Sequence, residues 1–395
     1  MAVRHGYGKI AGTDALVFAY DTGDTRNSYK GEPTTNLISS DGLDMTTLGS
    51  YTLLTRSQVA DSSSPSGYAC EMEIQDGATI NPAARIQFGN AASIPTSGNV
   101  FISVYAKFQG GPTSNIVPRV YTGYNWYDMA PLDGGSIYLT SEYRRFGVYV
   151  QVGTGSGGPN PGFSMTHNNS NRQTGQKSRW HSPQVELKSH TTPFVNGTRS
   201  ATQGLLDLIG NSSIDLSNVS FNSSAEKVFD GTNDYIGVAS SVLNNLTGPM
   251  SCEAVFLIDS NPGDWVRIFG KGNNESRTYG LWYNYSSNLF LYQRYSSGGG
   301  MNAQLSSAGI QLNKYYHMVG TSTANTHTLY INGVAVATAT NSNTFYSNSD
   351  TMNIGFSNVH TYHHGTAPVA KLYNRALTAS EVKNNYNNYK TRFNI

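Results

Sequence analysis

The sequence predicts an all-β protein with two β-sandwich (jelly-roll) domains in tandem, a short N-terminal arm and one short C-terminal helix. Its 395 residues are enough for two or three domains. Turn-forming and β-forming residues are abundant, with 41 Gly and 26 Tyr. Short apolar segments recur between turns rich in Gly, Pro and Asn, and the body of the chain has no persuasive helical period. This pattern is typical of β-sandwiches.

The charge balance excludes several classes of protein. The 26 Lys and Arg nearly cancel the 25 Asp and Glu, so the chain lacks the basic surface that a duplex-binding protein needs. An aromatic content of 11% excludes a highly charged disordered chain. No apolar run approaches the roughly 20 residues of a membrane span. We therefore expect a soluble protein with no nucleic-acid partner and no membrane insertion.

The N-terminal residues and the cysteines indicate the compartment. Residues 1–8 contain no apolar segment of the kind found in signal peptides. Cys70 and Cys252 are expected to lie in different domains, so a structural disulfide is not expected. Both observations favour folding in a reducing cytoplasm.

We expect three parts along the chain. Residues 1–35 form an arm, residues 36–192 a jelly-roll domain and residues 193–395 a second sandwich. The arm has one short apolar run, and a single strand cannot bury its own face. It should therefore pair with another chain or with the body of the protein. The residues that would attach it are Leu16, Val17, Phe18 and Tyr20.

Several elements of the two sandwiches can be predicted individually. Residues 101–108 and 145–152 alternate as strands in the first sandwich. In the second, residues 205–209 are expected to be a strand. Asn332-Gly333 suits a type I′ turn between two strands. Thr378-Ala379-Ser380-Glu381 is a capping box, which predicts a helix at about residues 379–389.

The second half resembles a laminin-G or concanavalin A-like lectin domain of the bacterial and phage type. The residues that carry the resemblance are Phe229-Asp230-Gly231-Thr232-Asn233-Asp234-Tyr235-Ile236, Tyr316-His317-Met318-Val319-Gly320, Leu329-Tyr330-Ile331-Asn332-Gly333 and the stretch from Ala370 to Val382. These are core and turn positions. The resemblance therefore implies a fold more strongly than a ligand.

The first half resembles the carbohydrate-binding-module-like jelly rolls of phage tail and fibre proteins. The resemblance rests on Trp180-His181-Ser182-Pro183-Gln184-Val185-Glu186-Leu187 and Thr192-Pro193-Phe194. The order of arm, jelly roll and lectin-like sandwich is similar to virion proteins of tailed bacteriophages. This resemblance implies a virion protein assembled in the bacterial cytoplasm. It also implies that the arm binds other virion proteins and that the protein is a homo-oligomer, for which a trimer is one option.

Sugar recognition is the chemistry that fits the aromatic clusters best. Aromatic faces stack on the apolar side of a pyranose, and amide, carboxylate and backbone groups bind its hydroxyls. In a strand, Trp282 and Asn284 share one face while Tyr283 and Tyr285 share the other. The alternative is that these rings pack the sandwich or a subunit interface. The candidate glycan-binding residues are Tyr124, Trp126, Tyr127, Trp265, Trp282, Tyr283, Tyr285, Tyr292, Tyr362 and His363.

Catalytic and metal-binding motifs are weak. Hydrolases of the concanavalin type carry a Glu-x-Asp-x-Glu run, and the nearest approach here is Glu71-x-Glu73, so we predict no enzyme. The histidines of segment 360–364 have no nearby Cys or acidic residue to complete a zinc site, and hydrogen bonding to a sugar is an alternative role for them. No cofactor is expected, with calcium left open. The weak calcium candidates are Asp230, Asp234, Asp259 and Asp264, for which ordinary Asx turns are the alternative.

These observations together predict a bacteriophage virion structural protein. It would be a tail fibre or another surface-exposed component with an adhesive, glycan-binding role in host attachment. One alternative is a capsid or tail decoration protein that stabilises the particle without binding a ligand. Another is a secreted or accessory glycan-binding module.

Overall fold

The chain forms two compact units. The computed structural model describes residues 15–38, 54–75, 86–87, 95, 97–112, 115–122, 125–152, 164–167, 172–223, 226–261, 263–272, 276–296, 301–341 and 345–395. The split unit comprises Met1–Pro33, Ser200–Asn222 and Glu226–Ile395, and the inserted unit comprises Thr34–Arg199 with Ser223–Ala225. The inserted unit therefore interrupts the sequence of the split unit. Each unit contains one buried free cysteine, Cys252 and Cys70 respectively.

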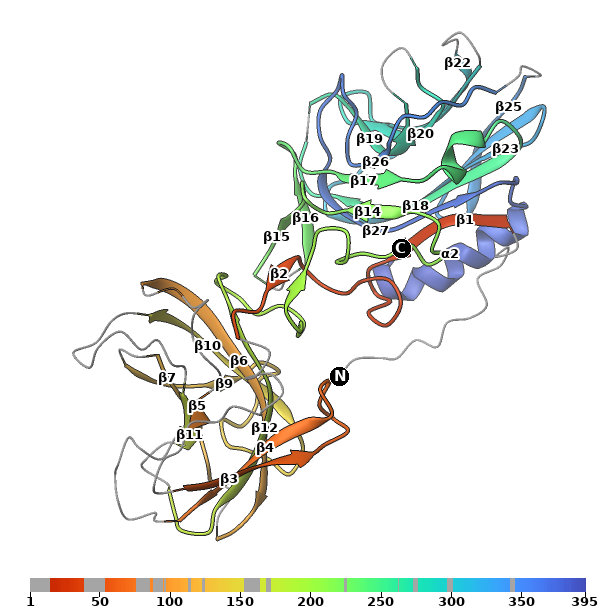
Figure 1. The fold of residues 1–395 in the computed structure, drawn as a ribbon. Helices are drawn as coiled ribbons and strands as arrows, with labels where there is room; N and C mark the ends of the chain where they lie inside the picture. The colour runs from red at the N-terminus through yellow and green to blue at the C-terminus, as the bar shows by residue number, and fades with distance from the viewer. Residues whose placement is uncertain are drawn as a thin grey trace. The chain divides into compact units, whose positions relative to one another are not determined.

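The split unit is a sandwich of two antiparallel sheets (Figure 1). The larger sheet runs in the order β15 (Ser220–Phe221), β16 (Lys227–Asp230), β27 (His364–Tyr373), β18 (Met250–Ile258), β23 (Lys314–Ser322), β24 (Thr326–Ile331), β25 (Val334–Thr340). The seven-stranded sheet runs β14 (Ser213–Asp215), β17 (Ile236–Ala239), β26 (Met352–Ile354), β19 (Trp265–Lys271), β20 (Tyr279–Asn284), β21 (Leu289–Tyr295), β22 (Met301–Ala308). Side chains from both sheets share one core, to which Phe256 and Tyr283 belong. This arrangement confirms the predicted all-β sandwich class.

The inserted unit has its own sheets and its own core. Its six-stranded sheet runs β3 (Leu54–Ala60), β4 (Tyr68–Ile74), β12 (Lys177–Glu186), β6 (Gly98–Gly110), β10 (Arg144–Val152), β9 (Ala130–Pro131). The four-stranded sheet runs β5 (Ile86–Gln87), β11 (Ser164–His167), β7 (Pro118–Tyr121), β8 (Trp126–Asp128). A short pair joins β2 (Thr34–Thr35) to β13 (Thr198–Arg199). Val120 and Met165 of the smaller sheet share a core with Trp180 of the larger one.

The apolar run of the predicted arm forms a strand of the larger sheet of the split unit. β1 (Leu16–Asp21) pairs antiparallel with β27 within the split unit. Leu16 and Val17 are buried and Phe18 and Tyr20 are completely inaccessible. The Tyr20 hydroxyl donates a hydrogen bond of 2.8 Å to the Ala367 carbonyl oxygen. Of the two predicted options, the structure therefore has the arm's strand pair with the body of the protein, and these four side chains pack against their own chain instead of being free to attach it to another protein.

Residues 205–209 are not the predicted strand. The Asp207 carboxylate instead accepts hydrogen bonds from backbone N–H groups, which curl the segment into a turn. Its donors are Ala19 and Ile209 at Oδ1 and Asn211 and Ser212 at Oδ2, at 3.0 to 3.1 Å. The apolar spacing of the segment predicted a strand, but an aspartate that binds four amides favours a compact turn.

The predicted hairpin and helix are confirmed. Asn332 and Gly333 have φ values of 50° and 74°, and β24 pairs with β25 across them. The helix α2 (Ala379–Phe393) begins with the complete Thr378–Glu381 capping box. It extends beyond the expected end to Phe393, and Asn394 caps it in the left-handed conformation. Within the described residues, no helix combines the length and hydropathy that a bilayer-spanning segment requires.

Truncation of Phe18 should destabilise the split unit alone. Phe18 is inaccessible and its ring stacks on Phe269, with centroids 6.5 Å apart. Phe18→Ala should therefore lower the unfolding free energy of this unit by about 3–5 kcal/mol. Pulsed thiol labelling in urea, read by mass spectrometry, reports each unit through its single cysteine. We expect Cys252 to become reactive at lower urea while the transition of Cys70 stays unchanged.

The matched control is Val336→Ala, because Val336 lies on β25 and is 39% exposed. It should leave both transitions in place. An unchanged Cys252 transition in Phe18→Ala would show that β1 is dispensable to the split unit.

Candidate functional site

The outer face of the seven-stranded sheet carries a cluster of rings and charged side chains. Alternation along β20 places Leu281 and Tyr283 in the hydrophobic core of the sandwich. Trp282 and Asn284 consequently point to the opposite, outer face. The expectation that these two residues share one face therefore agrees with the structure.

Trp282 lies flat on this outer face. Gly270 and Gly280 are paired across β19 and β20, and a Cβ atom at Gly280 would collide with the Trp282 indole. The guanidinium carbons of Arg267 and Arg277 lie 5.3 and 5.1 Å from the centroid of the indole ring. These are cation–π distances. Trp282 is only 1% exposed, so it does not provide the predicted exposed surface for a sugar.

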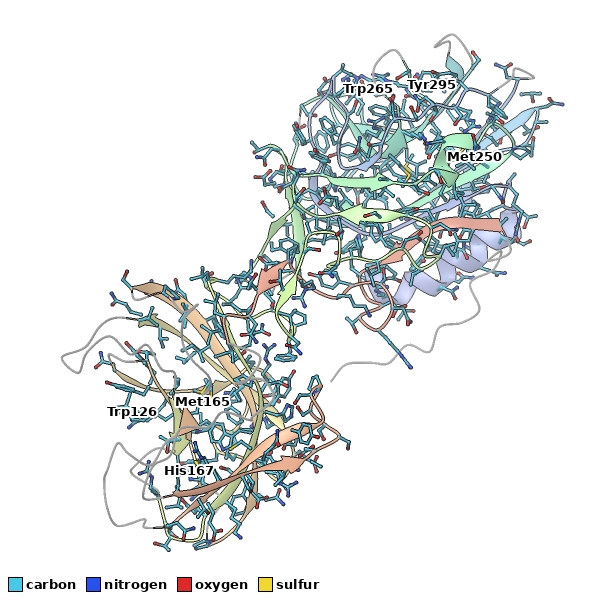
Figure 2. All side chains as sticks on the ribbon, in the orientation of Figure 1. Trp126, Met165, His167, Met250, Trp265 and Tyr295 are labelled. Carbon is cyan, nitrogen blue, oxygen red and sulfur yellow. The ribbon has the colours of Figure 1, made fainter. Side chains whose placement is uncertain are left out.

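Trp265 is the partly exposed ring of this cluster. It begins β19, is half-buried, and lies edge-on to Trp282 with centroids 6.4 Å apart. The His360 ring lies 6.2 Å from Trp265 and 5.8 Å from Trp282. Thr361 Oγ1 donates a 3.1 Å hydrogen bond to the Trp265 carbonyl oxygen, which holds the His360 segment against β19. Figure 2 shows Trp265 and Tyr295 toward the same side of the split unit.

A chain of polar contacts begins beside Trp265. Asp264 Oδ2 lies 3.5 Å from His360 Nδ1. His360 Nε2 lies 3.2 Å from Arg277 Nη2. Arg277 Nη1 then donates a 3.3 Å hydrogen bond to the Tyr295 hydroxyl oxygen. The contacts link the segment before β19 to β21.

The same chain of contacts continues to β22. The Tyr295 hydroxyl donates to Gln293 Oε1 at 2.8 Å, and Gln293 Nε2 donates to Gln304 Oε1 at 2.9 Å. The two ends, Asp264 and Gln304, are exposed, whereas Tyr295 and Gln293 are buried. We call this set the polar track; it consists of Asp264, His360, Arg277, Tyr295, Gln293 and Gln304.

The contacts of His360 determine its tautomer. Arg277 can only donate, so His360 Nε2 accepts and the proton resides on Nδ1, which faces Asp264. Burial lowers the pKa of His360, Asp264 opposes this effect, and the positive charge of Arg277 adds to it. The ring is therefore neutral at neutral pH. This end of the polar track therefore offers both hydrogen-bond acceptors, on the Asp264 carboxylate, and hydrogen-bond donors, on the Arg277 guanidinium and the His360 ring.

The other predicted aromatic residues fall into two groups. Tyr283, Tyr292 and His363 are buried in the sandwich core, so they cannot form a sugar-binding surface. The Tyr292 hydroxyl lies 2.6 Å from Ser322 Oγ. The half-buried residues are Trp126, Tyr127, Tyr285 and Tyr362. Tyr127 and Tyr285 pack against the cores of their own units, Tyr362 stacks on Phe356, and Tyr124 lies outside the described residues.

Sequence reasoning missed most of the polar track. Arg277 and Gln293 stand in segments that no motif distinguishes. His360 is distinguished in the sequence only as part of its histidine-rich segment. The alternation of side chains along a strand was the signal that could have found these residues. Once Tyr292 is assigned to the core, Gln293 and Tyr295 must lie on the outer face of β21.

The carboxylates considered for calcium are engaged in local contacts. Asp230 Oδ1 accepts the Thr232 amide at 2.8 Å, and Asp234 Oδ2 accepts the Asp230 amide at 2.8 Å. Asp259 pairs with His364. Among the described residues, no three His, Cys, Asp or Glu side chains converge as a metal-binding group. Calcium binding stays a prediction.

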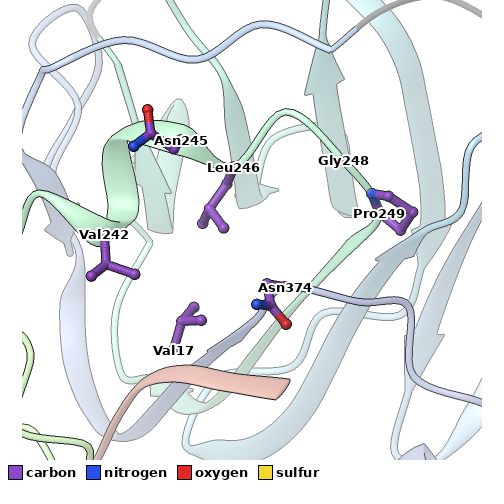
Figure 3. Close-up of a pocket in the computed structure, with 7 residues that line it drawn as sticks. All are labelled: Val17, Val242, Asn245, Leu246, Gly248, Pro249 and Asn374. Carbon is purple, nitrogen blue, oxygen red and sulfur yellow. The ribbon is translucent and has the colours of Figure 1, made fainter. Parts of the chain in front are cut away.

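A separate cavity of about 400 Å³ lies in the split unit (Figure 3). It is lined by Val17, Val242, Asn245, Leu246, Gly248, Pro249 and Asn374. Two amides and several aliphatic groups offer hydrogen bonds and apolar contact. No lining residue is aromatic, so nothing here can stack on a sugar ring. The outer face at Trp265 is therefore the better candidate site.

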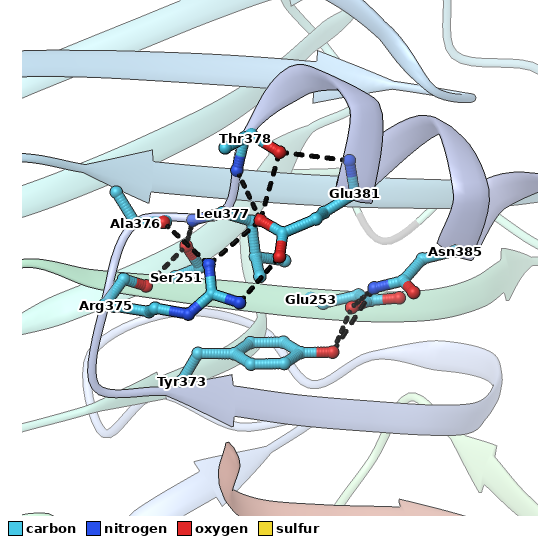
Figure 4. A network of polar contacts seen from close by, with 9 residues as sticks. All are labelled: Ser251, Glu253, Tyr373, Arg375, Ala376, Leu377, Thr378, Glu381 and Asn385. Carbon is cyan, nitrogen blue, oxygen red and sulfur yellow. Dashed lines mark hydrogen bonds and ion pairs between the residues drawn. The ribbon is translucent and has the colours of Figure 1, made fainter. Parts of the chain in front are cut away.

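A second titratable cluster is structural. Glu253 is inaccessible on β18 beneath α2, where its carboxylate accepts hydrogen bonds of 2.9 Å each from the Tyr373 hydroxyl and from Asn385 Nδ2 (Figure 4). His317 Nε2 lies 3.0 Å and Lys371 Nζ 3.6 Å from the same carboxylate. Burial alone would raise the pKa of Glu253, but Lys371, His317 and Tyr373 together lower it to about 2. The Glu253 carboxylate therefore holds α2 against the sheet. Because the helix covers it, the carboxylate is not accessible to a ligand.

This network should make the split unit sensitive to acid. The pKa of Glu253 is lowered from 4.5 to about 2 on folding, so its contribution is complete above pH 4.5 and declines as the pH falls toward 2. Glu253→Gln should flatten that part of the stability profile. At pH 7 it should cost about 3–5 kcal/mol, because Lys371 is left buried without its partner. Urea unfolding between pH 2 and 7 measures both effects.

The control is Glu226→Gln, because Glu226 is exposed, and this variant should reproduce the wild-type dependence of stability on pH. If Glu253→Gln showed the same dependence on pH as the wild type, the role assigned to Glu253 would be contradicted.

The geometry around His360 predicts how its ring titrates. Its pKa should lie below 6.5, with the neutral ring protonated at Nδ1. Arg277→Gln should raise this pKa by removing a positive charge, and Asp264→Asn should lower it by removing a negative one. Nitrogen-detected NMR of the histidine rings across a pH series reports both the tautomer and the pKa. A neutral ring protonated at Nε2 would rule out the proposed order of the polar track.

Comparison with known proteins bears on the split unit. Residues 230–383 match the family model described as the concanavalin A-like lectin/glucanases superfamily. No curated protein sequence matches the chain. The split unit thus has a lectin-like β-sandwich fold.

Solved structures that are similar to the chain include receptor-binding domains of botulinum neurotoxins. The ligand-binding domain of serotype D, in complex with N-acetylneuraminic acid, is 13% identical with a TM-score of 0.39, covering 48% of this chain and 49% of that one. The receptor-binding domain of the C/D mosaic serotype is 13% identical with a TM-score of 0.38, covering 47% and 48%. The chain spans about half the length of these structures. Likenesses this distant carry no information about what the present chain binds.

Proposed function

We propose that the split unit binds a carbohydrate at the Trp265 end of its outer sheet face. The observation that carries this proposal is the polar track, which begins at exposed Asp264 beside a half-buried tryptophan. A sugar hydroxyl both donates and accepts, and this end offers a carboxylate acceptor next to imidazole and guanidinium groups. The Trp265 ring supplies the apolar surface on which a pyranose can stack.

The packing around Trp265 supports a preorganised site. His360 is held between Asp264 and Arg277, and the Thr361 hydrogen bond fixes the backbone that carries it. Ordering these side chains in advance removes part of the entropic cost of binding. The half-buried Trp265 and the exposed Asp264 fit weak binding to a single sugar and stronger binding when several copies act together.

We infer that the protein is a surface component of a bacteriophage virion that attaches to host or environmental glycans. The support is the order of the two sequence resemblances, a jelly roll followed by a lectin-like sandwich. Multivalent display on a particle would also give a weak site a useful avidity.

Removal of the Trp265 ring should abolish most of the binding. A glycan microarray with fluorescent wild-type protein identifies the ligands, and calorimetry gives the dissociation constant for the best one. Trp265→Ala should weaken that interaction about tenfold or more, equivalent to about 1.4 kcal/mol, through the loss of stacking. Tyr149→Ala is the control, because Tyr149 is a 48% exposed ring in the inserted unit. Undiminished affinity in Trp265→Ala, or no ligand on the array, would refute the proposed site.

The virion role has its own test. Immunogold labelling of purified particles with antibody against residues 200–395 should place the label on tail fibres or the distal tail. Label spread over the capsid would favour the decoration alternative. Absence of label on particles whose protein content includes the chain would exclude a surface role.

A further inference from the structure

The outer face of the four-stranded sheet in the inserted unit carries a second ring pair. Tyr121 on β7 is paired with Trp126 on β8, and their centroids lie 5.0 Å apart at 37°. Val120 belongs to the core and Tyr127 packs against it, so alternation places Tyr121 and Trp126 on the outer face. Both rings are half-buried. They form an apolar surface that is partly open to solvent.

An ion pair lies on the same face, two residues further along each of the two strands. Arg119 and Asp128 are paired across β7 and β8, and Arg119 Nε lies 2.6 Å from Asp128 Oδ1. Their side chains are 23% and 47% exposed. A surface pair of this kind contributes only about 0–1 kcal/mol to stability. Its groups can therefore exchange partners with a ligand at little cost to the fold.

On the side of β11, this face is buried. Thr166 on β11 lies opposite Arg119, and Arg172 Nη2 donates a 3.1 Å hydrogen bond to the Thr166 hydroxyl. Both residues are buried. The part of the face that is open to solvent therefore contains the ring pair and the ion pair on β7 and β8. Thr166 on β11 marks its edge.

We propose that this face is a second carbohydrate-binding site, which takes one pyranose through stacking on Trp126 and through two adjacent ring hydroxyls. One hydroxyl donates to the Asp128 carboxylate while its neighbour accepts from the Arg119 guanidinium, so the ligand bridges the ion pair. The ring pair and the ion pair lie two residues apart on both strands and on the same face, which sets the stacking surface beside the hydroxyl-binding groups. All of these residues belong to the inserted unit, so this site is independent of the one at Trp265.

Fluorine NMR of protein labelled with fluorotryptophan separates the two sites. The chain has 4 tryptophans: Trp126 and Trp180 in the inserted unit, Trp265 and Trp282 in the split unit. The probes are the methyl pyranosides of mannose, galactose and glucose, with the fully O-methylated glucoside as a control that keeps the ring but removes the hydroxyl donors. We expect saturable movement of the Trp126 signal with at least one hydroxylated probe. Trp180 is inaccessible and should remain unshifted, which reports an intact inserted unit.

The matched variants test the bridging role of the ion pair. Asp128→Asn should weaken the response of Trp126 about tenfold by removing the charged acceptor. Asp133→Asn is the control, because Asp133 is 62% exposed in another surface ion pair of the same unit, 2.5 Å from Arg144. It should leave the response unchanged. Equal responses in the two variants would overturn the bridging role, and so would movement with the O-methylated probe.

The outcomes for the two sites are distinguishable. Movement of Trp126 alone supports the second site and counts against the one at Trp265. Movement of Trp265 or Trp282 with a fixed Trp126 signal overturns the second site and leaves the first. If no tryptophan responds at millimolar probe, both sites fail as monosaccharide-binding sites.

Discussion

The pairing of β1 with β27 is the constraint on which the split unit depends. It joins Leu16 to Tyr373 and Asp21 to Val369, so the first described strand is held by one of the last. Arg392 from α2 donates two hydrogen bonds, of 2.7 and 2.8 Å, to the Asp21 carboxylate. The N-terminal strand and the C-terminal helix therefore stabilise each other. Because the contacts are so distant in sequence, this unit can complete its fold only after its last residues are available.

This long-range closure also explains how the candidate site can be exposed. The larger sheet carries the closing contacts: β1 pairs at β27, and α2 covers Glu253 on β18. The seven-stranded sheet takes no part in either contact. Its outer face is consequently available for polar and aromatic side chains, and the glycine pair at 270 and 280 lets two large side chains lie flat there.

Short sequence motifs correctly predicted those elements that depend only on neighbouring residues. The Asn332-Gly333 turn and the Thr378–Glu381 capping box depend on neighbouring residues, and both formed as expected. The strand predicted at residues 205–209 failed because Asp207 binds an amide of β1, which no local pattern reveals. For the arm, the need for a partner strand was predicted, but which strand pairs with it was not, since that strand lies about 350 residues away in sequence.

The aromatic content was a weaker guide to the site than it first appears. Buried tyrosines satisfy their hydroxyls internally: Tyr20 binds the Ala367 carbonyl, Tyr292 contacts Ser322 and Tyr373 binds Glu253. Such rings act as core residues with a polar end, so their number says little about sugar binding.

Tryptophan placement discriminates better than tyrosine content. Trp180 is inaccessible and Trp282 is covered by guanidinium groups, whereas Trp126 and Trp265 are each half-buried. Each of the half-buried rings lies beside a carboxylate that is about half exposed, Asp128 for one and Asp264 for the other. The same pairing of a partly open indole with an accessible acceptor thus occurs once in each unit. That repetition ties the carbohydrate hypothesis to particular side chains, where the composition alone could only suggest it.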